Sequence, residues 1–233
     1  MESQLDEQGM YDGFGSLQIK RASTAEQVAE ALRQMILRGD VEQGQPLREV
    51  SLASTIGVSR NTMREAIRVL AREGIVTHQM HRGAVVTRLT GGDIEDIFRV
   101  RRVLELAAVS ATRDAEPEQL AGLADAVNAL AAAARVGDWG AIIDADQLFH
   151  ERLVALLGSR RLSRFFNAIQ AEIRLCMSIV DRSSSDTDAL IAEHQELLRL
   201  ILDREVDRCA EVMGGHLDES EEMLRALVPE DAR

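Results

Sequence analysis

The chain has 233 residues, of which 45% are hydrophobic and 28% charged, a composition that indicates a folded globular protein and excludes an intrinsically disordered one. No apolar run approaches the roughly 18 residues of a membrane span, and the acidic N-terminus lacks the pattern of a signal peptide, so we expect a cytoplasmic protein without a membrane partner. Two cysteines are too few for a disulfide framework.

The net charge of −12 by itself argues against binding to nucleic acid, but the charge is unevenly distributed. Residues 1–19 carry a net charge of −4, residues 20–90 carry +4, and residues 91–233 carry −12. A basic segment between acidic ones suggests a DNA-binding module. We therefore expect a flexible acidic arm over residues 1–19, a DNA-binding domain over residues 20–89, and an acidic domain over residues 90–233.

The basic domain is expected to contain three helices and a hairpin. In chain order, these elements are a helix capped by Ser23 or Thr24 and stopped by Gly39, helices over residues 49–56 and 60–73, and strands over residues 75–79 and 84–89. Ser59 and Gly74 are suitable N- and C-caps for the third helix. This order is typical of a winged helix-turn-helix, whose second motif helix enters the DNA major groove.

The first turn of the third expected helix carries side chains that suit base edges. Arg60 and Arg64 lie four residues apart on one helical face, where arginine can pair bidentately with guanine, and Asn61 could pair with adenine. The residues predicted to contact DNA in this helix and at the hairpin tip are Ser59, Arg60, Asn61, Thr62, Arg64, His81, Arg82 and Gly83. The alternative is an ordinary solvated basic face.

This segment resembles a known family. The run Gly57-Val58-Ser59-Arg60-Asn61-Thr62-Met63-Arg64-Glu65-Ala66-Ile67-Arg68-Val69-Leu70, followed by Glu73-Gly74-Ile75-Val76, is similar to the winged-helix domain of GntR-type bacterial repressors. The resemblance covers residues 24–88 and implies that Arg60 and Arg64 touch DNA and that the wing glycine enters the minor groove. The sequence departs from the family at Gln43-Gly44, where P-G is usual, and at Val50, where some members carry an arginine; Arg48 is the nearby arginine expected to contact DNA.

From Thr90 onward the sequence has helix signals and no convincing strand signal. Thr90 is expected to cap the first helix, and Pro117 to begin the second. The expected helices cover residues 90–115, 117–136, 138–157, 161–181, 187–202 and 205–227, with a polar loop at 183–186. The fold class is therefore mainly α, with an N-terminal winged helix-turn-helix and a C-terminal antiparallel helical bundle.

Three of the five histidines fall on these helices. Asp146 precedes His150 by four residues, so both side chains lie on one helical face. His194 and His216 lie at similar distances from a tight turn between two antiparallel helices. An aspartate and three histidines at one level of a bundle could bind a divalent metal. The alternative is a set of unrelated core or surface histidines.

Residues 92–227 resemble the helical effector domain of FadR-like GntR regulators, called FCD. The similar runs are Val100-Arg101-Arg102-Val103-Leu104-Glu105, Asp146-Gln147-Leu148-Phe149-His150-Glu151-Arg152-Leu153, His194-Gln195-Glu196-Leu197 and His216-Leu217; Ser159 departs from the asparagine of many relatives. The resemblance implies a metal held by Asp146, His150, His194 and His216, with zinc as the first expectation and nickel, manganese or iron as alternatives. It also implies that Arg101 faces a carboxylate effector; the alternative is a salt bridge to Glu105.

These features predict a non-enzymatic transcription regulator, expected to be a bacterial repressor that binds a palindromic operator in double-stranded DNA as a homodimer. A small organic acid at the metal site would control its affinity for the operator. One alternative is a regulator that responds to the metal alone. A second is a metal-dependent hydrolase fused to a DNA-binding module, but the sequence has no H-E-x-x-H motif, and Glu151 is expected to point to another face from His150.

Overall fold

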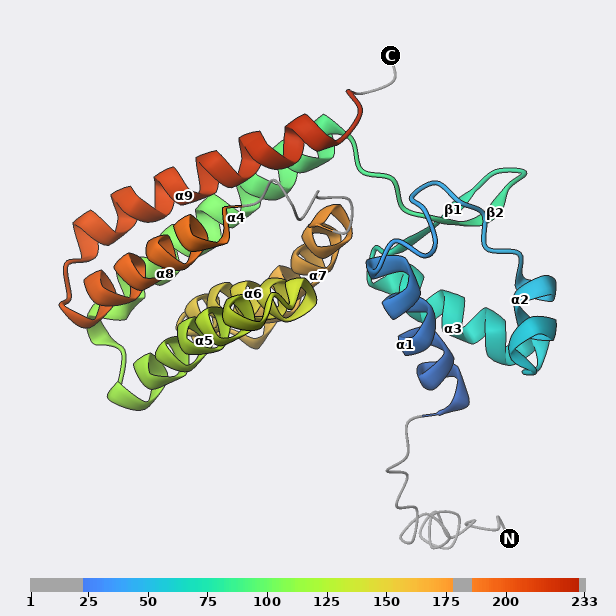
Figure 1. Ribbon diagram of the computed structural model, residues 1–233, viewed down its shortest axis with the longest axis horizontal. Coiled ribbons are helices and arrows are strands. Elements are labelled where there is room, and N and C mark those ends of the chain that lie inside the picture. Colours follow the sequence, from blue (N-terminus) through green and yellow to red (C-terminus); the bar gives the residue numbers. More distant parts are fainter. Residues whose placement is uncertain (1–22, 178–185, 231–233) are drawn as a thin grey trace, which may run out of the picture.

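The computed structural model describes residues 23–177 and 186–230 (Figure 1). The expected acidic arm, the last residues of the helix expected at 161–181, and all but the last residue of the loop expected at 183–186 lie outside this part of the chain. The predicted fold class is confirmed, because a small helical domain with a hairpin is followed by an all-helical bundle. No helix in the described part combines the length and apolar character needed to cross a membrane.

The N-terminal domain has the order of elements that the sequence predicts. Its elements are α1 (Thr24–Leu37), α2 (Glu49–Ile56), α3 (Arg60–Arg72) and the antiparallel strands β1 (Val76–Gln79) and β2 (Gly83–Val86). Ser23 and Glu26 form a capping box at the start of α1, which satisfies backbone N–H groups that a helix N-terminus leaves unpaired. Leu32, Met63 and Ile67 are buried where α1 and α3 pack together.

The predicted limits of α3 and of the strands are wrong by a few residues. The C-cap of α3 is Glu73, and Gly74 follows it with a φ of 76°, a left-handed conformation that favours glycine. The amide of Ile75 still bonds to the last turn of the helix, so β1 begins one residue later than predicted. Strand β2 ends at Val86, and Leu89 is buried in the core of the second domain instead.

The C-terminal domain is a bundle of helices. They are α4 (Gly91–Ala111), the 3-10 turn η1 (Thr112–Asp114), α5 (Pro117–Val136), α6 (Trp139–Ala155), α7 (Arg160–Met177), α8 (Thr187–Leu202) and α9 (Val206–Leu227). Helix α4 packs along α9, and α5 packs along α6 (Figure 1). The helix predicted at 90–115 is shorter than expected because its last turn tightens into η1.

Helix α7 belongs to both domains. Ile173 and Cys176 are buried in the bundle, whereas Leu175 between them is fully buried in the core of the winged-helix domain. The side-chain amide of Gln43, in the turn before α2, donates to the carbonyl of Leu175 at 3.0 Å. The last turn of α7 therefore couples the two hydrophobic cores.

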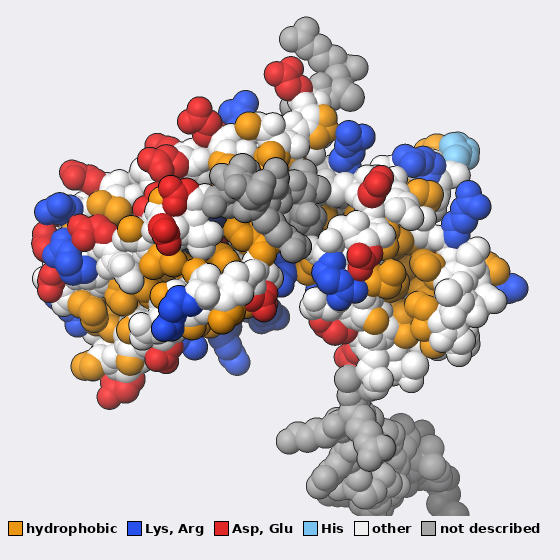
Figure 2. All heavy atoms as spheres, in the orientation of Figure 1, with side chains coloured by type: hydrophobic (Ala, Val, Ile, Leu, Met, Phe, Trp, Pro, Cys, Tyr) orange, Lys and Arg blue, Asp and Glu red, His pale blue; other side chains and the backbone are white. Residues whose placement is uncertain are grey.

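Charged side chains are distributed over the surface as the sequence predicts. Figure 2 shows acidic side chains gathered over the bundle, especially along α9, and basic side chains around the winged-helix end, with further basic side chains at the opposite end of the bundle. The bundle includes most of the segment whose net charge is −12.

Candidate metal centre and DNA-binding surface

The N-terminus of α3 is fixed by its own hydroxyl groups. Ser59 Oγ accepts the backbone N–H of Thr62 at 3.0 Å and lies 2.8 Å from Thr62 Oγ1. Ser59 thus caps the helix and bonds to Thr62, another predicted DNA-binding residue, an arrangement that holds the first turn in place. Arg60 and Asn61 project from that turn and are exposed.

Two further arginines predicted to bind DNA flank this turn. The Nε of Arg64 lies 3.3 Å from Glu49 at the start of α2, in an ion pair that is half exposed and therefore easily exchanged for a phosphate or base. Arg48 is exposed at the position just before α2. The structure therefore places Arg60 and Arg64 on the first turns of α3 and Arg48 at the start of α2, next to Glu49, the partner of Arg64.

The hairpin tip is shaped by two residues with positive φ. His81 has a φ of 64° and Gly83 a φ of 74°, and both are exposed. A Cβ on Gly83 would meet nothing within 4 Å, so its backbone conformation, rather than crowding, favours glycine. The guanidinium of Arg82 donates to Gln79 and, at 3.1 Å, to the carbonyl of Gly44. Arg82 therefore ties the wing to the turn before α2.

Inside the bundle, the three predicted histidine ligands come together. His150 on α6, His194 on α8 and His216 on α9 are each buried, and a ring nitrogen from each lies within 4.8 Å of the others. His150 Nε2 and His216 Nε2 are 3.3 Å apart. Asp146 joins them, with Oδ1 3.2 Å from His194 Nε2 and 3.9 Å from His150 Nε2.

The other nitrogen of each histidine ring has an acceptor. His150 Nδ1 lies 2.5 Å from Glu105, His216 Nδ1 lies 2.9 Å from Glu193, and His194 Nδ1 lies 2.9 Å from the carbonyl of Leu190. An acceptor at Nδ1 places the proton there, so each Nε2 carries a lone pair. Carboxylate and carbonyl partners of this kind orient metal-binding histidines.

The converging lone pairs are a test of whether these residues fit a metal ion. Two facing Nε2 acceptors cannot satisfy each other, and His194 Nε2 is buried with no hydrogen-bond partner among the described residues, although Asp146 Oδ1 lies 3.2 Å away. Buried polar atoms normally have partners. A divalent cation would satisfy all three nitrogens at once, and the donor set of three imidazoles and one carboxylate suits zinc, nickel, manganese or iron. The residues therefore fit the ion that the sequence predicts.

The local charges act differently on two of the histidines: burial favours the neutral ring of His150, whereas, although burial opposes this, Asp146 raises the pKa of His194. Burial lowers the pKa of His150 to about 4, so its ring is neutral at pH 7, as a metal ligand must be. Burial alone would raise the pKa of Glu105, but the charge of Arg101 and the contact with His150 lower it to about 2. Burial likewise opposes ionisation of Asp146, yet its histidine neighbours hold its pKa below the usual range.

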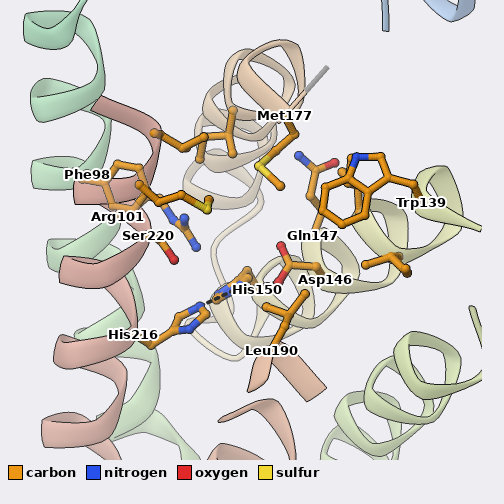
Figure 3. Close-up of a pocket in the computed structure, with 15 residues that line it drawn as sticks. Phe98, Arg101, Trp139, Asp146, Gln147, His150, Met177, Leu190, His216 and Ser220 are labelled. Carbon is orange, nitrogen blue, oxygen red and sulfur yellow. Dashed lines mark hydrogen bonds and ion pairs between the residues drawn. The ribbon is translucent and has the colours of Figure 1, made fainter. Parts of the chain in front are cut away.

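Arg101 forms the salt bridge to Glu105 that the sequence offered as an alternative. Its Nε donates to Glu105 at 2.7 Å, and its guanidinium carbon lies 4.9 Å from the ring centre of Phe98. It also lines a cavity of about 60 Å³ beside the histidines (Figure 3). The other lining residues are Phe98, Trp139, Ile142, Ile143, Asp146, Gln147, His150, Ile173, Met177, Leu190, His216, Ser220, Met223 and Leu224.

Sequence reasoning missed two residues of this centre. Glu193 bonds to His216 on a different helix, and the sequence contains no signal for a contact between helices. Trp139 lines the cavity from the first turn of α6, and no motif in the sequence marks it as part of a site. By contrast, the sequence did indicate Glu105 as a partner of Arg101. Glu105 follows Arg101 by four residues on the same helix, and this spacing places the two side chains next to each other.

Comparisons with protein families match both domains. Residues 24–86 match the family described as bacterial regulatory proteins, gntR family, and residues 96–219 match the FCD domain. A crystal structure described as a transcriptional regulator GntR from Rhodococcus sp. RHA1 has a TM-score of 0.77 and 26% identity, covering 88% of this chain and 99% of that one.

Two curated relatives are also regulators. An uncharacterized HTH-type transcriptional regulator of Agrobacterium vitis is 36% identical over 129 residues, which cover 54% of this chain and 75% of the relative. The gluconate operon transcriptional repressor of Bacillus licheniformis is 27% identical over 207 residues, covering 86% of this chain and 85% of the relative.

Proposed function

The chain belongs to the GntR family of bacterial regulatory proteins and carries an FCD domain, and we propose that it is a repressor whose affinity for DNA is controlled at the histidine cluster. It is a DNA-binding transcription regulator, and repressors are among its relatives. In this proposal a small carboxylate effector binds in the cavity beside Asp146 and the three histidines. The protein acts in the cytoplasm as a homodimer on a palindromic operator.

One observation carries this proposal: three buried histidines bring ring nitrogens within 4.8 Å of one another, and two of them, His150 and His216, line a cavity that a charged arginine also lines. A divalent metal held by Asp146, His150, His194 and His216 would offer open coordination positions to an effector carboxylate. Arg101 would donate its remaining N–H groups to the same carboxylate, since only its Nε bonds to Glu105. Zinc is the first choice for this donor set.

Helix α7 gives the cavity a physical connection to the DNA-binding domain. Ile173 and Met177 line the cavity, and the backbone carbonyl of Gln170 accepts from Gln147 of the cavity wall at 2.7 Å. Leu175, between the two lining residues, is packed in the winged-helix core. An effector that moves α7 would therefore move α3 relative to the bundle, which gives the two bound states different affinities for DNA.

The hydrolase alternative has no support at the candidate centre. Glu151, the acidic neighbour of His150, accepts from Asn167 at 2.9 Å on the exposed surface and is directed away from the histidines. The comparisons find transcription regulators rather than enzymes.

The experiment that tests the proposal measures operator affinity of the zinc-loaded protein by fluorescence anisotropy, with and without butanoate or 4-hydroxybutanoate. We expect either acid to weaken DNA binding by about 5- to 150-fold, the usual range of coupling between two sites. The variant His216→Ala should bind the DNA but not respond to the acids. If zinc alone changes the affinity and the acids do not, the protein responds to the metal, and if neither has an effect, the proposal is wrong.

A further inference from the structure

The tip of the hairpin presents an apolar side chain to the surroundings. Met80 is 84% exposed, the largest exposed fraction among the large hydrophobic side chains that the structure describes. It lies in the short loop between β1 and β2, whose last paired residues are Gln79 and Gly83. A single exposed apolar side chain is common on protein surfaces, so exposure alone assigns it no role. The role follows from the loop that holds it and from the surface to which that loop belongs.

The loop that carries Met80 has a defined conformation. The amide of Arg82 bonds to the carbonyl of Gln79 at 3.2 Å, which closes a four-residue turn with Met80 and His81 at its centre. His81 has a φ of 64°, and a positive φ is what a type II turn requires at its third position. Residues other than glycine seldom adopt this conformation, and strained residues of this kind gather at functional sites.

The side chain of Arg82 braces this turn against the rest of the domain. Its guanidinium donates to the side-chain oxygen of Gln79 at 3.0 Å and to the carbonyl of Gly44 at 3.1 Å. The turn is therefore tied both to β1 and to the segment before α2. Met80 projects from a braced support, so its side chain can be pressed against a partner without displacing the loop.

The end of the molecule that carries the hairpin tip is also the end that binds DNA. Figure 1 shows the tip and the start of α3 at the same end, away from the bundle. Exposed arginines, among them Arg48, Arg60 and Arg82, give this end positive charge that suits phosphates. Because the start of α3 occupies the major groove, the tip meets the adjoining minor groove. An apolar side chain gains nothing from phosphates there, whereas the face of a stacked base pair is apolar surface that it can cover.

We propose that Met80 is a minor-groove wedge, whose side chain enters between two base pairs at the edge of the operator half-site, partly unstacks them and bends the DNA. Methionine is among the apolar side chains that proteins insert between base steps, and the cost of unstacking is offset by the contacts that bent DNA makes with the protein. This inference rests on DNA binding by the winged helix and not on control by an effector, so the two can fail separately.

The wedge makes the protein selective for deformable DNA. Steps in which a pyrimidine precedes a purine, such as TA and CA, kink and unstack most easily. The thioether of Met80 is only a weak hydrogen-bond acceptor, so it selects a step through the ease of unstacking rather than through the edges of the bases. The operator should therefore carry a pyrimidine–purine step where the hairpin tip lies, outside the base pairs that α3 contacts.

The test uses the whole chain and an operator duplex that the wild type selects from a pool of random DNA. The bend of this duplex is measured by energy transfer between dyes at its two ends. The variant Met80→Gln keeps the length of the side chain but ends it in a polar amide, so the bend should fall by at least about 20°. Operator affinity should fall about tenfold, as expected when an apolar contact is lost.

Two further variants show whether the effect belongs to the apolar tip. Met80→Leu stays apolar and should keep the bend and the affinity of the wild type. Met35→Gln is the matched control, because Met35 on α1 is also an exposed methionine of the winged-helix domain. It should behave as the wild type does.

A second readout locates the unstacked step. The fluorescent base 2-aminopurine, which brightens when it leaves the stack, replaces one adenine of the operator at a time. The wild type and Met80→Leu should brighten it at a pyrimidine–purine step beside the base pairs that α3 contacts, and Met80→Gln should not. Replacing that step by two purines should weaken binding of the wild type and leave Met80→Gln unaffected.

The outcomes separate this inference from DNA binding itself. If Met80→Gln bends the operator as the wild type does, or if no 2-aminopurine position brightens, the wedge is overturned while binding by α3 stands. If Met35→Gln loses the bend to the same extent as Met80→Gln, the effect does not belong to the hairpin tip, and the wedge is also overturned. If the wild type selects no operator from the pool, the premise of DNA binding fails, and this inference fails with it.

Discussion

The side-chain amide of Gln43 donates a hydrogen bond to the backbone carbonyl of Leu175, and this 3.0 Å contact joins residues 132 positions apart. Gln43 precedes the first motif helix, and Leu175 lies on α7, which also lines the cavity beside the histidines. The bond therefore connects the helix-turn-helix with the bundle at the point where a displacement of α7 would first reach the DNA-binding domain.

We predict that Gln43→Ala weakens communication between the two domains. Acid binding, measured by calorimetry, should be unchanged, but the effect of butanoate on operator affinity should decrease by about 0.5–2 kcal/mol, the range for residues along a coupling route. Gln45→Ala is the matched control, because the side chain of Gln45 bonds to Glu42 within the same turn. An equal loss in both variants would show that the turn, rather than this bond, carries the coupling.

Zinc should stabilise the native protein and depend on the buried histidines. At a free zinc concentration 100 times the dissociation constant, binding adds about 2.7 kcal/mol to the free energy of unfolding. For a chain of this length that corresponds to a rise of about 5–11 °C in the melting temperature, measured by calorimetry with and without chelator. His194→Ala should abolish the rise. The control variant is His78→Ala, because His78 is exposed on β1. This variant should keep the zinc-dependent rise in melting temperature. If it loses the rise, zinc does not bind at the buried histidines alone.

Glu105→Gln should impair the centre more than Glu193→Gln, although both carboxylates accept from a histidine. Glu105 is fully buried and also pairs with Arg101, so its loss leaves a buried charge unpaired and should cost about 3–5 kcal/mol of stability in urea unfolding of the metal-free protein. Glu193 is 37% exposed, and its replacement should cost much less. Zinc affinity, measured by chelator competition, should fall by about 10- to 100-fold in Glu105→Gln.

The stability difference between the wild type and Glu105→Gln should also depend on pH. The pKa of Glu105 is lowered from 4.5 to about 2 in the folded state, so its contribution is complete above pH 4.5 and is lost as the pH falls through 2. The gap between the two proteins should therefore narrow over this range. If the difference in unfolding free energy between the two proteins stays constant from pH 4.5 to pH 2, the folded protein does not stabilise the ionised form of Glu105.

Arg60→Ala and Arg64→Ala should each weaken operator binding by about 1–3 kcal/mol if they contact bases. The measurement is anisotropy on operator and non-operator DNA over a series of salt concentrations, since base contacts change specificity and phosphate contacts change the salt slope. Arg99→Ala is the control, because Arg99 is an exposed arginine of the bundle paired with Glu95. If neither variant of α3 differs from this control, the assignment of the DNA-binding helix is wrong.

The sequence predicted the elements best where local chemistry decides their ends. Helix α5 begins at Pro117 and ends before Gly137, which adopts the left-handed conformation, and both limits agree with the prediction. The three histidines were also predictable as a group, because helical spacing and a short turn constrain their level in the bundle. Other features depend on contacts between segments that are distant in the sequence, and these could not be predicted. Nothing near Leu175 in the sequence indicates that it completes the core of another domain, and the pairing of Glu193 with His216 requires the helices to be already assembled.

The uneven charge of the molecule has a consequence for how it approaches DNA. The segment that forms the bundle has a net charge of −12 and is repelled by phosphates, whereas the segment of the winged helix has a net charge of +4 and is attracted. A molecule diffusing toward a duplex therefore experiences a torque that turns α3 and the wing to the front before any contact forms. This orientation raises the fraction of productive encounters, and it fades with rising ionic strength as the field is screened.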